Sequence, residues 1–239
     1  MTRVVISQPM YFPWPGFLAQ MALADVYVWL DDAMFSKGSF TNRIQVKLGA
    51  ERKWMSVPLD GKGTGQRIME LSAAKPGWQA AHRALLAQSL AGKPERAMAL
   101  EMFDGVAATA PLCDLLIAST EIMARALGIL PARVLRASAL DVAGSGWPRV
   151  RDMVAALGGT RYLTGHGAAA YLDHEAFEAA GIEVAYMDYR VGAWPQDGAF
   201  TPYVSALDLI ASCGADGARE RLNPATVPWR DFLEERSMR

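Results

Sequence analysis

The opening of the chain constrains its fold most, because a short apolar strand runs directly into a turn stiffened by proline. Residues 4–6 are β-branched and apolar, which is typical of a strand buried on both faces. Three prolines between residues 9 and 15 restrict the backbone, and Gly16 leaves it free where the next element begins. Residues 17–24 suit a short helix and residues 25–30 a second strand. The sequence therefore predicts a β-turn-α-β opening.

This opening also predicts where a site lies. A crossover between parallel neighbours is right-handed by strong precedent, and ligands of such sheets bind at the carboxyl ends of the strands. The turn at residues 8–16 and the pair Asp31 and Asp32 each follow a predicted strand. We expect them to meet at one edge of the sheet and to form part of a small-molecule site.

The remainder of the chain fits the same fold class. Residues 44–48 and 53–58 predict a hairpin, and residues 76–128 read as a helical insertion. Further strands are expected at 134–137, 161–164 and 182–187, and further helices at 147–157, 171–180 and 205–213. With no repeat or linker in the sequence, we predict one α/β domain over residues 1–239. Its sheet is expected to be mainly parallel and to open with a right-handed β-α-β unit.

Charge and composition exclude several functions. The 239 residues carry a formal net charge of −1, which offers no field for binding nucleic acid. No stretch approaches the ~20 apolar residues that span a bilayer, so we expect no membrane insertion. The two cysteines lie far apart and outside any metal-binding spacing, and the start of the chain lacks the pattern of a secretory signal. A soluble cytoplasmic protein is predicted, with no particular cofactor or oligomeric state indicated.

Four residues of the first two strand ends are candidates for the site. Gln8 offers amide donors and an acceptor on a rigid mount, or else satisfies backbone groups of the turn. Tyr11 belongs to an aromatic group among the prolines, which favours a hydrophobic plug over a stacking platform. Asp31 or Asp32 can bind a hydroxyl or amine, hold Mg²⁺, act as a general base, or cap the next segment. Since adjacent strand residues point to opposite faces, one of the two is expected to reach the site.

Two later segments add candidates. Lys37, Asn42 and Arg43 lie in one connection that suits an anionic group such as phosphate, or is ordinary solvated surface. His166 lies between two glycines after a predicted strand, in an expected flexible loop where a general base would be useful. The chain has no GxGxxG, GxxxxGK[ST], HExxH or GxSxG motif, so phosphate loops, zincins and α/β-hydrolases have no support.

The assembled segments resemble the WbqC-like family over essentially the full chain. The resemblance is carried by Trp54, Gln196 and residues 6–17, 24–26, 31–32, 36–37, 40–43, 57–58, 161–165, 171–173, 181–184, 200–202 and 205–208. It implies a bacterial protein of gene clusters for O-antigen and other surface polysaccharides. The activity that it implies is transfer of an acyl or aminoacyl group to an amino sugar.

Three hypotheses follow. The first is a transferase that acylates an amine of a small acceptor, such as a nucleotide-linked amino sugar. Asp32 or His166 would be the base, Gln8 or Asn42 the oxyanion donor, and Lys37 with Arg43 the phosphate contacts, while Tyr11, Asp31 and Gln196 complete the predicted substrate site.

The second hypothesis is an ATP-dependent enzyme, because the opening also resembles nucleotidyltransferase-type α/β domains. Those domains carry a His-x-Gly-His turn where this chain has residues 14–17 without histidine. Asp31 or Asp32 would then hold Mg²⁺. The third hypothesis is a non-catalytic binding or scaffold protein of a biosynthetic complex.

Overall fold

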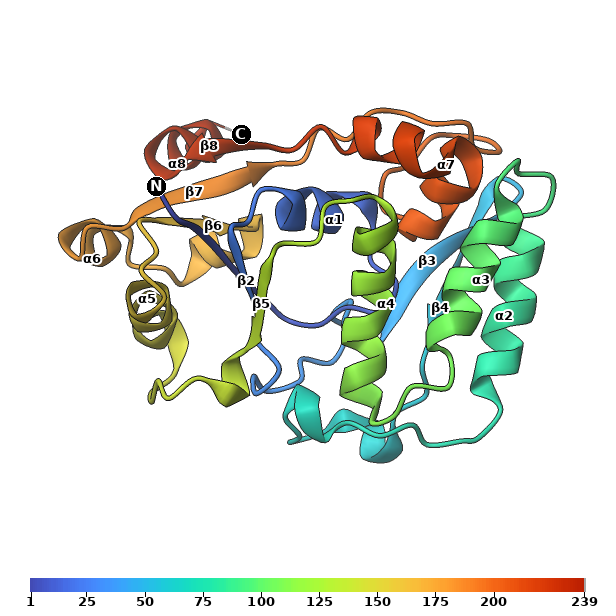
Figure 1. Cartoon of the computed structure of the whole chain (residues 1–239), viewed down its shortest axis with the longest axis horizontal. Coiled ribbons are helices and arrows are strands. Elements are labelled where there is room, and N and C mark those ends of the chain that lie inside the picture. The colour runs from blue at the N-terminus through green and yellow to red at the C-terminus, as the bar shows by residue number, and fades with distance from the viewer. Residues whose placement is uncertain (239) are drawn as a thin grey trace.

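The computed structural model describes residues 1–238 and has a six-stranded sheet at its centre, with a separate two-stranded hairpin beside it (Figure 1). Strands follow the order β5-β2-β1-β6-β7-β8 in the sheet, and all neighbours are parallel except β7 and β8. The strands are β1 (Arg3–Ser7), β2 (Val26–Trp29), β5 (Arg133–Arg136), β6 (Arg161–Thr164), β7 (Glu183–Asp188) and β8 (Ala225–Pro228), and the hairpin is β3 (Arg43–Leu48) with β4 (Glu51–Ser56). The predicted α/β class and mainly parallel sheet are confirmed.

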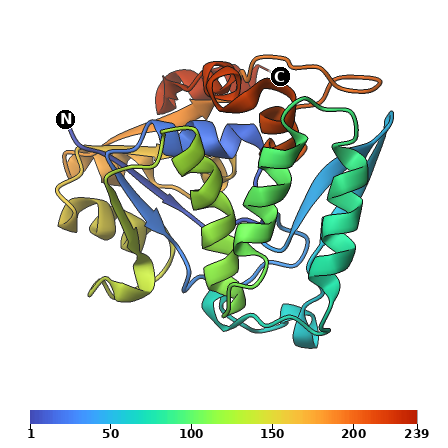
Figure 2. The same cartoon turned by 45° about the vertical axis from the view of Figure 1, so that its right-hand side comes forward.

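Helices cover both faces of the sheet (Figure 2). They are α1 (Pro15–Ala22), α2 (Trp78–Ser89), α3 (Arg96–Val106), α4 (Leu112–Ala126), α5 (Gly146–Ala156), α6 (His174–Ala179), α7 (Ala206–Leu222) and α8 (Trp229–Ser237). Short 3₁₀ turns lie at Asp60–Gly63, Ile68–Glu70, Ala137–Ala139 and His166–Ala170. No helix in residues 1–238 is long and apolar enough to cross a membrane.

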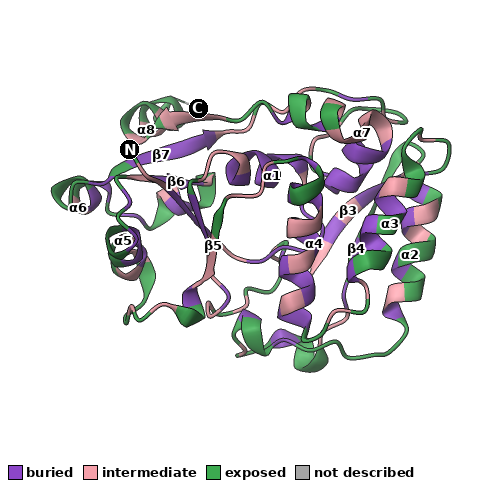
Figure 3. Cartoon of the chain, viewed as in Figure 1, coloured by how far each residue is buried: buried purple, intermediate pink, exposed green. Residues whose placement is uncertain are grey.

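Alternate residues of the central strands β1, β2 and β6 enter two different cores. Val5, Tyr27 and Leu163 pack with α1, α4 and α7, whereas Val4 and Val26 pack with α5 and α6 on the other face. Figure 3 shows the resulting buried strands between helices whose outer faces are exposed. Burial on both faces explains why the first strand is an uninterrupted apolar run rather than an alternating one.

Helices α2, α3 and α4 fill the segment that the sequence marks as helical, and they lie side by side next to the hairpin (Figures 1 and 2). Helix α2 packs on β3, and α4 returns towards the sheet, where it contacts α1. The side chain of Phe103 stacks on Phe12 with 5.3 Å between ring centroids, which joins this helical layer to the turn after β1.

Four elements differ from the sequence-based expectation. Residues 166–170 form a 3₁₀ turn rather than a flexible loop. Helix α7 continues beyond Gly214, where φ is 67°, to Leu222. Strand β8 and helix α8 were not predicted, because β8 has only four residues and α8 has no fully buried side chain to give a clear apolar stripe.

The path of the chain through the sheet reverses beside β1. From β1 the chain moves outward to β2 and β5, and it then crosses to β6 on the other side of β1. The carboxyl ends of β1 and β6 therefore flank the point where the strand order reverses, which is where open parallel sheets bind ligands. Gln8 directly follows β1, and Gly165 directly follows β6.

Gly159 is required by close packing at the start of β6. A Cβ atom added at Gly159 would lie 2.6 Å from Cγ2 of Val4 and 2.7 Å from Cγ1 of Val154. We therefore expect Gly159→Ala to lower the free energy of unfolding by about 1–3 kcal/mol, as overpacked cores do. Urea denaturation measures the change, and Gly167→Ala, with nothing within 4 Å of its added Cβ, is the matched control. Equal stability of the two variants would contradict this account.

Candidate functional site

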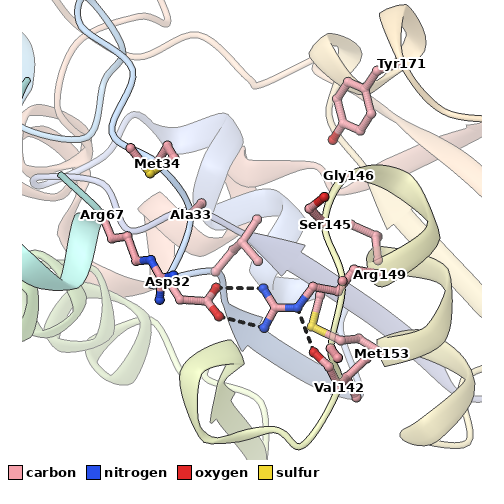
Figure 4. A pocket seen from close by; sticks show the side chains of 14 residues that line it. Asp32, Ala33, Met34, Arg67, Val142, Ser145, Gly146, Arg149, Met153 and Tyr171 are labelled. Atoms are coloured by element: carbon pink, nitrogen blue, oxygen red, sulfur yellow. Dashed lines mark hydrogen bonds and ion pairs between the residues drawn. The ribbon is translucent and has the colours of Figure 1, made fainter. Parts of the chain in front are cut away.

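A pocket of about 560 Å³ lies at the carboxyl end of β2, between the chain that follows β2 and the start of α5. We call it the α5 pocket (Figure 4). Its lining residues are Leu30, Asp32, Ala33, Met34, Arg67, Val142, Ala143, Gly144, Ser145, Gly146, Arg149, Val150, Met153 and Tyr171. Residues 30–34 directly follow β2, whereas Arg67 and the residues from Val142 to Tyr171 lie more than 30 positions further along the chain. The fold, rather than one sequence motif, therefore builds the pocket.

Asp32 forms a two-point ion pair with Arg149 of α5 inside this pocket. Nη1 of Arg149 lies 3.0 Å from Oδ1 of Asp32, and Nη2 lies 2.6 Å from Oδ2. The two side chains are only 15% and 12% exposed, and Nε of Arg149 also donates to the carbonyl of Val142 at 2.9 Å. The hydrogen bonds to Asp32 raise the pKa of Arg149 above its ordinary value. Asp32 is therefore held as an oriented carboxylate.

Asp31 has a different role from its neighbour. Its side chain is completely buried and accepts hydrogen bonds from the backbone N–H of Ser138 at 3.0 Å and from the Ser138 hydroxyl at 2.7 Å. Those bonds fix the 3₁₀ turn after β5. Asp31 therefore supports the edge of the sheet from within, and Asp32 is the carboxylate that lines the pocket.

Positive charge lies on both sides of the α5 pocket. Ser145 precedes the first turn of α5 without capping it through its side chain, so backbone N–H groups at this helix start are free of that partner. Arg67 is exposed and makes no ion pair with a residue among 1–238. In Figure 4 it lies on the other side of Asp32 from Arg149. Two arginines and a helix N-terminus thus face a single carboxylate, which favours an anionic ligand.

The turn after β1 is anchored in the core. Ser119 of α4 accepts a hydrogen bond from the N–H of Phe12 at 2.9 Å, and the neighbouring Thr120 donates to the carbonyl of Met10 at 3.2 Å. Tyr11 is completely buried, and its hydroxyl bonds Nδ1 of His82 at 3.0 Å. Gln8 is half-buried, and its amide makes no hydrogen bond within the described part of the chain. Tyr11 therefore belongs to a hydrophobic plug and offers no surface to a substrate, while Gln8 keeps a free amide beside the reversal point.

In the predicted phosphate loop, residues 37–43, the side chains of Asn42 and Arg43 bond to nearby backbone carbonyls. Arg43 donates to the carbonyls of Ser39, at 3.2 Å, and Gly38, and its guanidinium lies 4.3 Å from the centroid of the Trp54 ring. Asn42 donates to the carbonyl of Val57 at 2.9 Å, which ties the loop to the end of the hairpin. Lys37 is exposed in the same loop. None of these three predicted contacts lines the α5 pocket.

Two further predicted residues lie elsewhere. Gln196 exchanges hydrogen bonds of 3.0 Å with the backbone of Thr201 in both directions, so its amide holds a loop together. His166 lines a separate pocket, and its Nε2 lies 2.7 Å from the carbonyl of Met187. Because a carbonyl only accepts, Nε2 carries the proton and Nδ1 is the free acceptor when the ring is neutral. Asp32 and His166 therefore do not meet in one pocket.

Sequence reasoning missed Arg67, Arg149 and Tyr171 as pocket residues. The run Gly144-Ser145-Gly146 before a predicted helix was a usable signal, because such a run leaves backbone N–H groups accessible at a helix start. Arg149 had no such signal, since its partner lies 117 positions away. Within residues 1–238, no group of three His, Cys, Asp or Glu side chains is arranged to hold a metal ion.

Comparison with known proteins supplies the family. The sequence model of the WbqC-like protein family matches residues 8–220. The chain belongs to this family. A relative from Mycobacterium tuberculosis, described as "Uncharacterized protein Rv1507c", is 25% identical over 224 residues, which cover 90% of this chain and 96% of that protein. No solved structure matches the chain.

The WbqC match covers the whole α5 pocket and part of the pocket that contains His166. It begins at Gln8 and includes every residue of the α5 pocket, from Leu30 to Tyr171. It ends before β8 and α8, which contribute one wall of the pocket that contains His166. In this WbqC-like protein the α5 pocket is thus built wholly from the matched segment.

Proposed function

We propose that this WbqC-like protein is a transferase that moves an acyl or aminoacyl group onto an amine of a small phosphate-bearing acceptor. A nucleotide-linked amino sugar has this chemistry. The observation that carries the proposal is the α5 pocket, where one oriented carboxylate, Asp32, lies near a helix N-terminus and an arginine that makes no ion pair within residues 1–238. The reaction type, acyl or aminoacyl transfer, is inferred from the gene-cluster context that the family resemblance implies.

The phosphate group is assigned to the space between Arg67 on one side of the α5 pocket and the start of α5 on the other. Helix N-termini bind phosphate through free backbone N–H groups, and arginine adds a planar set of donors. Ser145 adds a hydroxyl on the α5 side. The α5 pocket replaces the Lys37 to Arg43 loop in this role, because Arg43 donates to backbone carbonyls within that loop and Asn42 donates to the carbonyl of Val57 at the end of the hairpin.

The amine is assigned to Asp32. It is the only carboxylate among the described residues that line the α5 pocket. Arg149 fixes both of its oxygens, which keep further lone pairs for the acceptor amine. In the transfer, the amine nitrogen bonds the acyl carbon, the bond from that carbon to the leaving group breaks, and Asp32 accepts the proton that the nitrogen loses.

Arg67 gives the test of this assignment. We expect Arg67→Gln to weaken binding of a UDP-linked amino sugar by about tenfold, because a charged hydrogen bond to phosphate is worth ~1.5 kcal/mol or more. Isothermal titration calorimetry measures the dissociation constant. Arg52→Gln is the matched control, since Arg52 is exposed on the hairpin away from the pocket.

Two results would refute the proposal. One is an unchanged dissociation constant in the Arg67→Gln variant. The other is the absence of product: after incubation with the sugar nucleotide and an acyl thioester, mass spectrometry would find no acceptor that is heavier by the acyl group. Binding without this product would favour the scaffold hypothesis instead.

The strand order favours a second candidate, an ATP-dependent enzyme of nucleotidyltransferase-like fold. Numbered within the six-stranded sheet alone, the order β5-β2-β1-β6-β7-β8 becomes 3-2-1-4-5-6, the arrangement of nucleotide-binding doubly wound sheets. Because Asp31 is completely buried and does not line the α5 pocket, Mg²⁺ there would be held by the nucleotide phosphates and by the lone pairs of Asp32 that Arg149 leaves free. Calorimetry with ATP, with and without Mg²⁺, tests this candidate, and no heat at millimolar ATP would exclude it.

A further inference from the structure

A second pocket of about 540 Å³ lies at the carboxyl ends of β6 and β7, on the other side of β1 from the α5 pocket. We call it the β7 pocket. Its lining residues are His166, Met187, Asp188, Tyr189, Arg190, Tyr203, Val227, Phe232, Glu235 and Arg236. They come from the turn after β6, the end of β7 and the C-terminal elements β8 and α8. None of them is used by the proposed transfer.

Aromatic rings form the walls of the β7 pocket. The His166 ring lies 4.9 Å from that of Tyr189 and 4.8 Å from that of Phe232, measured between centroids. Trp14, from the turn after β1, contacts Tyr189 at 4.8 Å and Tyr203 at 5.4 Å. Tyr203 nevertheless remains 53% exposed. A large aromatic face is thus held in place at the pocket wall but left open to a ligand.

The end of β6 is shaped to admit this aromatic wall. A Cβ atom added at Gly165 would lie 2.8 Å from the Tyr189 hydroxyl, so the glycine allows the tyrosine to lie across the strand end. The Nε2 proton of His166 is engaged by Met187, which holds the ring in one orientation. Its Nδ1 then remains as an acceptor.

The charges of the β7 pocket balance, in contrast to those of the α5 pocket. Two acidic residues, Asp188 and Glu235, and two basic residues, Arg190 and Arg236, line the β7 pocket. Arg190 pairs with Asp188, whereas Glu235 makes no ion pair with a residue among 1–238. A pocket with aromatic walls, a free carboxylate and no net charge suits a neutral ring that has hydrogen-bonding groups on its edge.

We propose that the β7 pocket binds the base of a nucleoside, stacked on Tyr203 and hydrogen-bonded at its edge to Glu235 and His166. Nucleobases combine a π-face with donors and acceptors at the rim, and stacking on an aromatic side chain is tolerant of base identity. The pocket adjoins the reversal point of the sheet, so a second, nucleoside-containing substrate would approach Gln8 from the side opposite the α5 pocket. The assignment does not depend on the proposed transfer.

Calorimetric titration of the full chain with adenosine and with uridine tests the proposal. Neither probe carries phosphate, so the α5 pocket assignment does not enter the result. We expect at least one nucleoside to bind with a submillimolar dissociation constant, and Tyr203→Ala to weaken it at least tenfold. Phe200→Ala is the matched control, because Phe200 is an exposed aromatic of the same segment that does not line the pocket.

A second variant distinguishes loss of binding from loss of folding. Glu235→Gln alters only an exposed side chain of α8, and it should weaken nucleoside binding at least threefold while leaving the melting temperature unchanged. No heat with either nucleoside at millimolar concentration, or equal affinity in wild type and Tyr203→Ala, would overturn the proposal. A loss of affinity in Tyr171→Ala in place of Tyr203→Ala would assign the base to the α5 pocket and overturn it as well. Failure of the transfer proposal shows up separately, as unchanged sugar-nucleotide binding in Arg67→Gln.

Discussion

Replacing Arg149 with methionine is expected to lower the free energy of unfolding by about 3 kcal/mol, the lower end of the range for removing one partner of a buried ion pair. The substitution leaves the Asp32 carboxylate, which is 12% exposed, without its two hydrogen bonds. It also breaks the bond to the carbonyl of Val142 that holds the chain before α5. Urea denaturation followed by circular dichroism measures the change.

Arg151→Met is the control for Arg149→Met. Arg151 lies one half-turn further along α5, where it pairs with its neighbour Asp152 and lies 5.6 Å from the centroid of the Trp147 ring, and a solvent-accessible pair of this kind contributes about 0–1 kcal/mol. The double variant Arg149→Met with Asp32→Asn should recover part of the lost stability, because no uncompensated charge remains. Equal destabilisation by Arg149→Met and Arg151→Met would contradict the role assigned to the ion pair.

Acid is expected to weaken the fold through His82. Burial lowers the pKa of His82 to about 4, below the ordinary value near 6.5, while its ring accepts from the Tyr11 hydroxyl and lies 3.2 Å from the carbonyl of Ser56. The unfolded chain therefore takes up the proton first as the pH falls. The stabilisation is present above about pH 6.5 and is lost towards pH 4, which amounts to roughly 3 kcal/mol between pH 7 and pH 4.

The His82 contribution is isolated by comparing two proteins at each pH. Wild type and His82→Gln are unfolded in urea at pH 7, 5.5 and 4.5, and the difference between their unfolding free energies should shrink as the pH falls. Other groups that titrate in this range, such as the buried His174, whose pKa is also lowered by burial, cancel in the difference. A difference that stays constant from pH 7 to pH 4.5 would contradict the prediction.

The elements that local sequence determines were predictable, and the contacts between distant segments were not. Strand β1 is predictable because burial on both faces leaves an apolar run, which can be recognised without knowing what packs against it. The separate fates of Asp31 and Asp32 depend on Ser138 and Arg149, each more than a hundred positions away. His166 was correctly placed after a strand, but strand order, which sequence pattern does not reveal, separates it from Asp32.

The ion pair between Asp32 and Arg149 has a consequence for the order of folding. Its partners are 117 positions apart, with the hairpin and helices α2 to α4 between them, so closing this contact carries a large loop entropy. The α5 pocket exists only in chains in which β5 has docked beside β2 and α5 has crossed to the other face. A ligand that touches both walls would then bind only the completed sheet and would raise its stability with concentration. Ligand-induced thermal stabilisation in this protein would therefore report the last long-range step of its assembly.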